Sequence, residues 1–207
     1  MAELNDYRQK LKAKILEVAM REFTTRGIRR IKMDDIAHMM HISKRTLYEI
    51  YADKESLLLE GIQLHASRME RMMEEFAQQP GVNVVDIIVK FFEVQLKSES
   101  NVNPLFYADI HKFPRIIEFV EARKSKNNQH AVDFLARGVE EGLFRDDINY
   151  KLTTIIRNYS LSVILEHQLY NSYSIADIAN SFTLVLVRGI CTEKGVALLD
   201  RAMEKYR

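Results

Sequence analysis

The sequence is poor in the residues that interrupt helices, with only three prolines and seven glycines in 207 positions. The patterns between these residues have a helical period, and no segment alternates convincingly as a strand would. A single cysteine, Cys191, excludes a disulfide within the chain and is typical of a reducing cytoplasm. The sequence therefore predicts an all-α protein.

Several functional signals are also missing. No apolar run approaches the roughly 20 residues that cross a bilayer, and the segment 1–6 lacks the basic-then-apolar pattern of a signal peptide. There is no glycine-rich phosphate loop and no nucleophile elbow. We therefore expect a cytoplasmic protein that does not contact membranes, is not an enzyme and needs no cofactor.

Metal ligation is also disfavoured. Asp34, Asp35, His38 and His41 include Asp-x-x-x-His and His-x-x-His spacings, which can bring ligands together on a helix. However, His41 is expected beyond the end of that helix. A di-iron bundle needs Glu-x-x-His pairs, and no histidine here follows a glutamate at that spacing. The sequence predicts no metal site, and Cys191 is interpreted as a packing residue in an apolar stripe.

Positive charge is concentrated between Arg26 and Lys54. This stretch has seven Lys or Arg and four Asp or Glu, a net +3 (seven minus four), whereas the whole chain has a formal charge of +1. Charge alone favours phosphate contact and a solvated helical face about equally.

The same basic stretch has the pattern of two short helices joined by a tight turn. Helices are expected at 7–26 and 33–40, and Gly27 ends the first of them. After a break at residues 41–42, Ser43 can cap a third helix over 43–51. The helices over 33–40 and 43–51 form a helix-turn-helix, a motif whose second helix typically enters the major groove of DNA.

The first 60 residues resemble the TetR family of bacterial transcriptional regulators. The segments that carry the resemblance are 15–19, 23–27, 35–37, 42–48, 51, 53–55 and 57–58. Their joint spacing is much more specific than a lone helix-turn-helix. The resemblance implies a homodimer that binds a palindromic operator in double-stranded DNA and represses transcription until a small molecule releases it.

The resemblance also implies roles for individual residues. Thr46, Tyr48 and Lys54 match positions that contact phosphates and groove edges, whereas Lys44 and Arg45 match variable positions that often read bases. Lys32 takes the place of the hydroxyl residues common before the second helix, and it can bind phosphate by charge. The predicted DNA-binding residues are Lys32, Ser43, Lys44, Arg45, Thr46, Tyr48 and Lys54.

Some positions depart from the family pattern. His41 stands where the family usually has glycine, so the turn must accommodate a side chain. Ile50 stands where an aromatic residue or histidine often touches phosphate, and we assign it to packing with Leu47 and Tyr51.

The remaining chain is expected to be a helical bundle. A long fourth helix over 54–78 has no flexible linker, so we place the domain boundary inside it. The prediction is a three-helix DNA-binding domain at 7–60 and a ligand-binding and dimerisation domain at 61–207. Helices in the second domain are expected at 84–97, 103–111, 114–141, 150–170, 175–191 and 196–206, which gives about nine or ten helices in all.

Polar residues within apolar stripes are candidates for an effector pocket, and methionine adapts to ligands of varied shape. Each candidate is also compatible with a hydrogen-bonded core position or a surface position. The predicted pocket for an apolar or aromatic effector consists of Met69, Phe91, Gln95, Tyr107, His111 and Tyr159.

The last two long helices carry more apolar surface than one side of a bundle needs. Two such helices can pair with a symmetry mate in a four-helix interface, although burial within one chain is the alternative. The predicted dimer interface consists of Ile164, Ile175, Ile178, Phe182, Val185, Leu186 and Gly189.

Two other functions remain open at this point. One is a helical protein-interaction module that binds no DNA, and the other is a ligand-independent regulator or an activator on the same scaffold. Selection of bound DNA from a random pool separates the first from a DNA-binding regulator.

Overall fold

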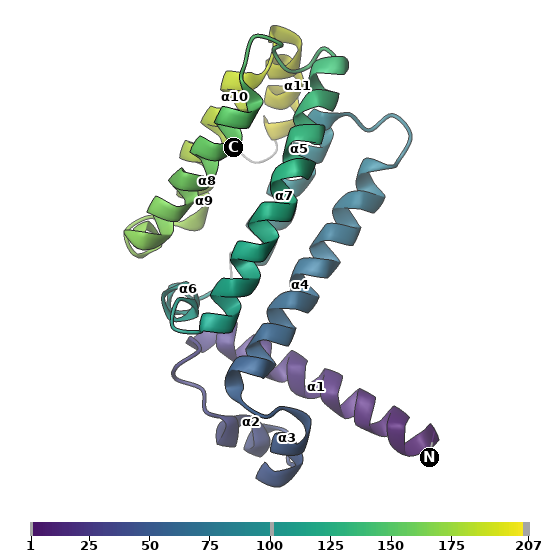
Figure 1. Cartoon of the computed structure of the whole chain (residues 1–207), viewed down its shortest axis with the longest axis vertical. Helices are drawn as coiled ribbons and strands as arrows, with labels where there is room; N and C mark the ends of the chain where they lie inside the picture. Colours follow the sequence, from purple (N-terminus) through teal and green to yellow (C-terminus); the bar gives the residue numbers. More distant parts are fainter. Residues whose placement is uncertain (1, 100–101, 205–207) are drawn as a thin grey trace. The chain divides into compact units, whose positions relative to one another are not determined.

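The computed structural model describes residues 2–99 and 102–204 (Figure 1). Within these ranges it omits the side chains of residues 2–5, 96, 98–99, 124–129, 161–162, 165, 170, 175–176, 179–180 and 183. The described residues form helices and no strand, with one isolated β-bridge between Phe144 and Cys191. The all-α prediction is confirmed.

Figure 1 labels the α-helices along the chain. The elements in order are α1 (Ala2–Arg26), α2 (Met33–Met39), α3 (Lys44–Ile50), α4 (Lys54–Ala77), α5 (Val84–Glu99), α6 (Pro104–Ile110), α7 (Pro114–Glu140), α8 (Tyr150–Glu166), the 3₁₀ turn η1 (Leu169–Asn171), α9 (Ile175–Ile178), the π-helix η2 (Ala179–Leu184), α10 (Val185–Ile190) and α11 (Glu193–Met203). Because α9, η2 and α10 run on without a break, the eleven α-helices among the described residues make ten continuous helices. The expected last helix was placed as far as Tyr206, which lies outside the described residues.

The chain divides into two compact units. The first comprises Met1–Met69 and Asn101–Val120, and the second comprises Glu70–Ser100 and Glu121–Arg207. Helices α4 and α7 therefore each contribute to both units. The first unit is larger than residues 7–60 because it includes α6, and the functional boundary near residue 60 stays a prediction.

The first unit has a core built from α1 to α4, α6 and the start of α7. Phe23, Ile36 and Leu47 are fully buried there, with Ile116 from the start of α7. Leu47 and the buried Tyr51 thus have the packing roles that the sequence indicated. This core holds the short α3, which has too few residues to be stable alone.

The residue before the short α6 is bonded to the end of α1 by one backbone and one side-chain hydrogen bond. The Asn103 backbone N–H donates to the Thr24 carbonyl at 2.7 Å, and the Asn103 side-chain amide donates to the Thr25 carbonyl at 3.2 Å. Gly27 has a positive φ of 88°, and a Cβ at that position would lie 2.9 Å from the Leu105 Cβ. A glycine is therefore needed at this point for two reasons, the backbone conformation and the close approach of α6.

The second unit has a separate apolar core. Val84, Leu143, Phe144 and Leu199 are nearly or fully buried in it. The ring of Phe144 packs directly against Gly138 of α7, where a Cβ would lie 1.9 Å from the ring. No helix in the described ranges is both long enough and apolar enough to span a bilayer.

Candidate nucleic-acid interface

Helix α3 begins at a well-formed cap. Ser43 has an extended backbone, and its Oγ accepts a hydrogen bond from the Thr46 N–H at 3.0 Å. The two hydroxyl groups of Ser43 and Thr46 also lie 2.8 Å apart, within hydrogen-bond distance. This satisfies a free N–H of the first turn and fixes the end of the helix that carries Lys44 and Arg45.

The turn before α3 contains a residue in the left-handed region. His41 has φ 54°, its side chain is exposed, and the following Ile42 N–H donates to the Ala37 carbonyl at 3.1 Å. The turn thus has the conformation for which glycine is best suited, and it accommodates a histidine side chain by pointing it into solvent.

The two cations at the start of α3 are exposed and paired with carboxylates of the same unit. Lys44 Nζ lies 2.5 Å from Asp34 Oδ2, and Arg45 Nε donates to Glu49 Oε1 at 2.8 Å. The hydrogen bond in each pair raises the pKa of the cation, so both stay charged. Exposed pairs of this kind contribute little to stability and can exchange for contacts with DNA.

Tyr48 is 48% exposed on the same helix as these cations. Lys32 is also exposed, and its backbone N–H donates to Asp35 Oδ2 at 2.8 Å, which caps the start of α2. Lys32 therefore stands directly before the second helix, with its side chain open to solvent.

Lys54 has a more enclosed position at the start of α4. Its ammonium group lies 6.0 Å from the centre of the Phe23 ring, within reach of a cation–π interaction. Burial lowers the pKa of Lys54, although the charges of Asp109 and Asp35 act in the opposite direction. Lys54 is thus a partly desolvated cation at a helix start in the first unit, which also contains the other six predicted DNA-binding residues.

Two residues that the sequence did not single out make long-range contacts in the first unit, one of them to the start of α4. The Arg115 backbone N–H donates to Glu55 Oε1 at 2.9 Å, and its Nη1 donates to Ser56 Oγ at 2.8 Å. Asp109, one of the few buried polar residues, accepts from the Arg29 N–H at 2.9 Å. These contacts join positions 59 to 80 residues apart, so spacing along the chain carries no signal of them.

The predicted effector residues are distributed over both units. Met69 and Tyr107 are partly buried and His111 is exposed in the first unit, whereas Gln95 is partly buried and Phe91 exposed in the second. Tyr159 is 72% exposed. The pocket that we expected from these residues stays a prediction.

Among the described side chains no group of three or more potential metal ligands occurs.

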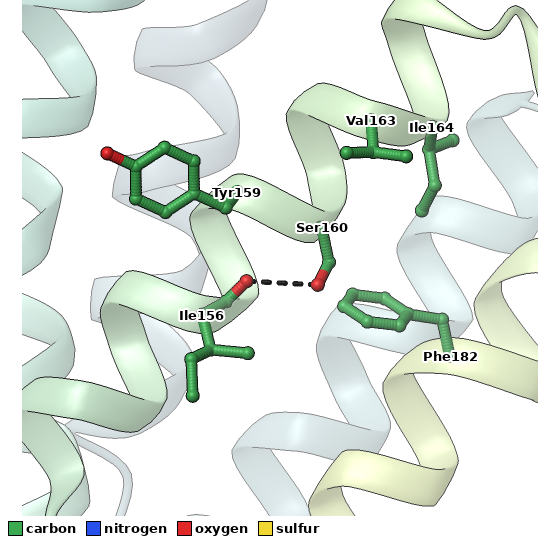
Figure 2. Close-up of a pocket in the computed structure, with 6 residues that line it drawn as sticks. All are labelled: Ile156, Tyr159, Ser160, Val163, Ile164 and Phe182. Atoms are coloured by element: carbon green, nitrogen blue, oxygen red, sulfur yellow. Dashed lines mark hydrogen bonds between the residues drawn. The ribbon is translucent and has the colours of Figure 1, made fainter.

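An open apolar groove lies on the outer side of α8 in the second unit. Figure 2 shows α8 carrying most of its residues, with Phe182 of η2 facing them. The groove has a volume of about 450 Å³ and is lined by Ile156, Tyr159, Ser160, Val163, Ile164 and Phe182. The Ser160 hydroxyl donates to the Ile156 carbonyl at 3.0 Å, so this polar group is satisfied within its own helix.

The groove brings together two of the predicted interface residues, Ile164 and Phe182, with one of the predicted pocket residues, Tyr159. Ile178 and Leu186 are partly buried, whereas Val185 and Gly189 are exposed. The side chain of Ile175 lies outside the described residues. The assignment of this set to a dimer interface stays a prediction.

Comparison with known proteins places these features in context. Residues 15–60 match the family described as bacterial regulatory proteins, tetR family. The HTH-type transcriptional repressor KstR2 of Mycobacterium tuberculosis is 25% identical over 193 residues, which cover 89% of this chain and 94% of the repressor. KstR2 of Mycolicibacterium smegmatis is 23% identical over 190 residues, which cover 87% of this chain and 91% of that protein.

Solved structures share the fold over most of the chain. The ketosteroid transcriptional regulator KstR2 of Mycobacterium tuberculosis superposes with a TM-score of 0.58 at 21% identity, covering 88% of this chain and 95% of that one. A TetR-family transcriptional regulator from Marinobacter aquaeolei reaches 0.69 at 17% identity, covering 95% and 98%. The matched segment 15–60 contains α2, the turn and α3. The N-terminal segment that contains the helix-turn-helix thus matches the TetR family of bacterial transcriptional regulators, and most of the chain shares the fold of such regulators.

Proposed function

We propose that this protein is a transcriptional repressor that binds a palindromic operator as a homodimer and is released by a small molecule. The observation that carries the proposal is the capped α3, whose start presents Lys44, Arg45 and Tyr48 to solvent. The relatives described as HTH-type transcriptional repressors support the same role.

In the DNA complex, α3 is the recognition helix. Lys44 and Arg45 exchange their carboxylate partners for phosphates and for the hydrogen-bond acceptors of base edges. Thr46, Tyr48, Lys32 and Lys54 contact the backbone and set the register of the helix. A palindrome is expected because two recognition helices related by a twofold axis read half-sites one helical turn apart, roughly 34–36 Å.

A second copy of the chain covers the apolar side of α8 in this proposal. Leu152, Ile155, Ile156, Tyr159 and Val163 are all exposed large hydrophobic residues of that helix. With Val185 they make an apolar patch of a kind that monomeric proteins rarely leave in water. A twofold interface would bury the groove against its own copy.

The effector acts by selecting between two arrangements of the dimer. A small molecule that binds better to the arrangement with poorly spaced recognition helices shifts the population and lowers operator affinity. KstR2 is described as a ketosteroid regulator, and this supports a largely apolar effector for the present protein as well.

Selection of bound DNA from a random pool tests the proposal. We expect enrichment of an inverted repeat, and loss of about 1–3 kcal/mol of binding free energy for Lys44→Ala and for Arg45→Ala in gel shifts on that repeat. Lys194→Ala, which removes an exposed cation of α11, is the matched control and should bind normally. A pool without enrichment would reject DNA binding, and unchanged affinity of both α3 variants would reject the assigned contacts.

A further inference from the structure

Arg157 is a partly buried cation of α8. It lies three residues after Thr154, which is 5% exposed, so helical spacing places both side chains on the same face. The neighbouring Ile155 and Ile156 are both exposed and mark the opposite, outer face. Ser160, three residues further along, and Ile164, seven residues further along, line the open groove. Helical spacing therefore places Arg157 between the buried face of α8 and the edge of that groove.

The guanidinium of Arg157 lacks a counter-charge in the described part of the structure. Its Nε is buried and has no acceptor, and its Nη2 makes one long hydrogen bond of 3.3 Å to the neutral Asn158 amide. No ion pair of the described residues includes Arg157. The carboxylates of Glu70, Glu141 and Asp200 pair with other arginines of this unit.

The surroundings offer no substitute for that counter-charge. Among the described residues of the second unit, Thr154 is the only buried side chain with a polar group other than the Cys191 thiol, and its hydroxyl is satisfied by the Tyr150 carbonyl at 2.8 Å. Burial lowers the pKa of Arg157, with no charged group opposing it. An arginine stays protonated under such conditions, so a desolvated positive charge is left without an anion.

We propose that Arg157 anchors the carboxylate of an acidic, otherwise apolar effector bound beside α8 in the second unit. This inference rests on the proposed function, since it specifies the chemistry of the molecule that releases the repressor. The unsatisfied Nε donates to a carboxylate oxygen, and the apolar side chains around α8 contact the remainder of the molecule. The planar guanidinium suits a carboxylate in geometry as well as in charge.

An apolar residue would pack at this position without the penalty of an unpaired charge. A partly buried charge without a partner is destabilising, and an anion that neutralises it binds more tightly than a neutral analogue of the same shape. The effector is therefore expected to stabilise the folded protein markedly.

The test compares carboxylates with their neutral counterparts on the full-length protein. Decanoate, 2-naphthoate and cholate are each titrated beside the corresponding alcohol or amide, with melting temperature and calorimetric affinity as readouts. At least one carboxylate should raise the melting temperature and bind at least tenfold more tightly than its neutral counterpart. This comparison needs only the natural protein, so it holds whatever a variant does to folding.

Variants then locate the site. Arg157→Met should remove the preference for the carboxylate and raise the melting temperature of the free protein, whereas Arg157→Lys should keep part of the preference. The control is Arg145→Met, which removes an exposed arginine paired with Asp147 in the same unit and should bind like the natural protein.

Three outcomes would overturn the inference. One is that no carboxylate binds better than its neutral counterpart, and another is that Arg157→Met binds the carboxylate as the natural protein does. The third is that Arg157→Met weakens self-association, which would assign the missing anion to a second copy. Gel shifts on the selected DNA are run in parallel. Carboxylate binding without DNA binding would refute the proposed function but support the carboxylate site at Arg157. DNA binding without a preference for carboxylates would support the proposed function but refute that site.

Discussion

At the scale of single residues, the candidate nucleic-acid interface combines a strained turn at His41 with two exposed cations, Lys44 and Arg45, that are paired with carboxylates. His41 is one of two described non-glycine residues with positive φ, at 54°. An L-residue with a Cβ adopts that conformation at a penalty of roughly 1–2 kcal/mol. The penalty is accepted at the point where the chain must turn sharply between α2 and α3.

Replacement of His41 by glycine should therefore stabilise the protein. We expect His41→Gly to raise the free energy of unfolding by about 1 kcal/mol, because glycine adopts positive φ without strain. His38→Gly, three residues earlier in α2, is the control and should lower it by about 1 kcal/mol. Urea unfolding of both variants measures the difference, and a loss of stability in both would show that the turn is not strained.

A substitution of Lys54 should affect DNA binding without lowering the stability of the protein. Burial lowers the pKa of Lys54 in the folded protein below the ordinary 10.5. Between these two pKa values the unfolded chain binds more protons than the folded protein. The contribution of Lys54 to the free energy of unfolding therefore rises as the pH increases through this range. At neutral pH both states are protonated, so the unfavourable desolvation is fully present.

Lys54→Met should keep the contact with Phe23 and lose the charge. We expect no loss of thermal stability at pH 7, but a fall of about one in the slope of log affinity against log salt for each bound protomer. The salt series is repeated with Lys194→Met, for which the slope should not change. An unaltered slope for Lys54→Met would remove this residue from the phosphate contacts.

At the scale of elements, local signals in the sequence predict the helices of the first unit well. Ser43 and Gly27 act within their own turns, so the start of α3 and the end of α1 could be read from neighbouring residues. The π-helix η2 inside the predicted segment 175–191 could not be foreseen, because it is a shift of hydrogen-bond register that changes no residue type.

The contacts that attach α6 and α7 within the first unit were equally inaccessible. Asp109 and Arg115 look like ordinary surface charges in the sequence, and only the fold brings them to Arg29, Glu55 and Ser56. Arg157 offered a weak signal, because it shares a helical face with Thr154. A charge on a buried face can be recognised only once the inward side of the helix is known.

The attachment of α6 depends on the buried carboxylate of Asp109. Asp109→Leu should destabilise the protein by about 1–3 kcal/mol, because the partly buried hydrogen bond from the Arg29 N–H to this carboxylate would be lost. Lys112→Met removes only the exposed partner of the same carboxylate and should change stability by less than about 0.5 kcal/mol. Equal effects of the two variants in urea titrations would assign the stabilisation to the ion pair instead.

At the scale of the whole molecule, the proposed dimer interface on the outer side of α8 can be tested by adding a charge to it. Ile156→Glu places a charge in the groove, where Ile156 is 52% exposed, and a second copy could bury it only at a large penalty. We expect the natural protein to elute at twice the 24.2 kDa chain mass and the variant at the chain mass.

Light scattering after gel filtration measures both masses. Tyr7→Glu is the control, because Tyr7 is an exposed aromatic residue of α1 outside the groove, and this variant should remain a dimer. A natural protein that is monomeric at micromolar concentration would contradict the proposed interface directly.

The chain passes from one compact unit to the other inside α4, between Met69 and Glu70, and again inside α7, between Val120 and Glu121. A helix turns by about 100° and advances 1.5 Å with each residue. One residue inserted into α4 would therefore change the rotational phase of everything beyond it, whereas a loop would absorb the same insertion. The number of residues in these two helices is thus as strict a requirement as their composition, and we expect surviving length changes to come in whole turns or to fall elsewhere.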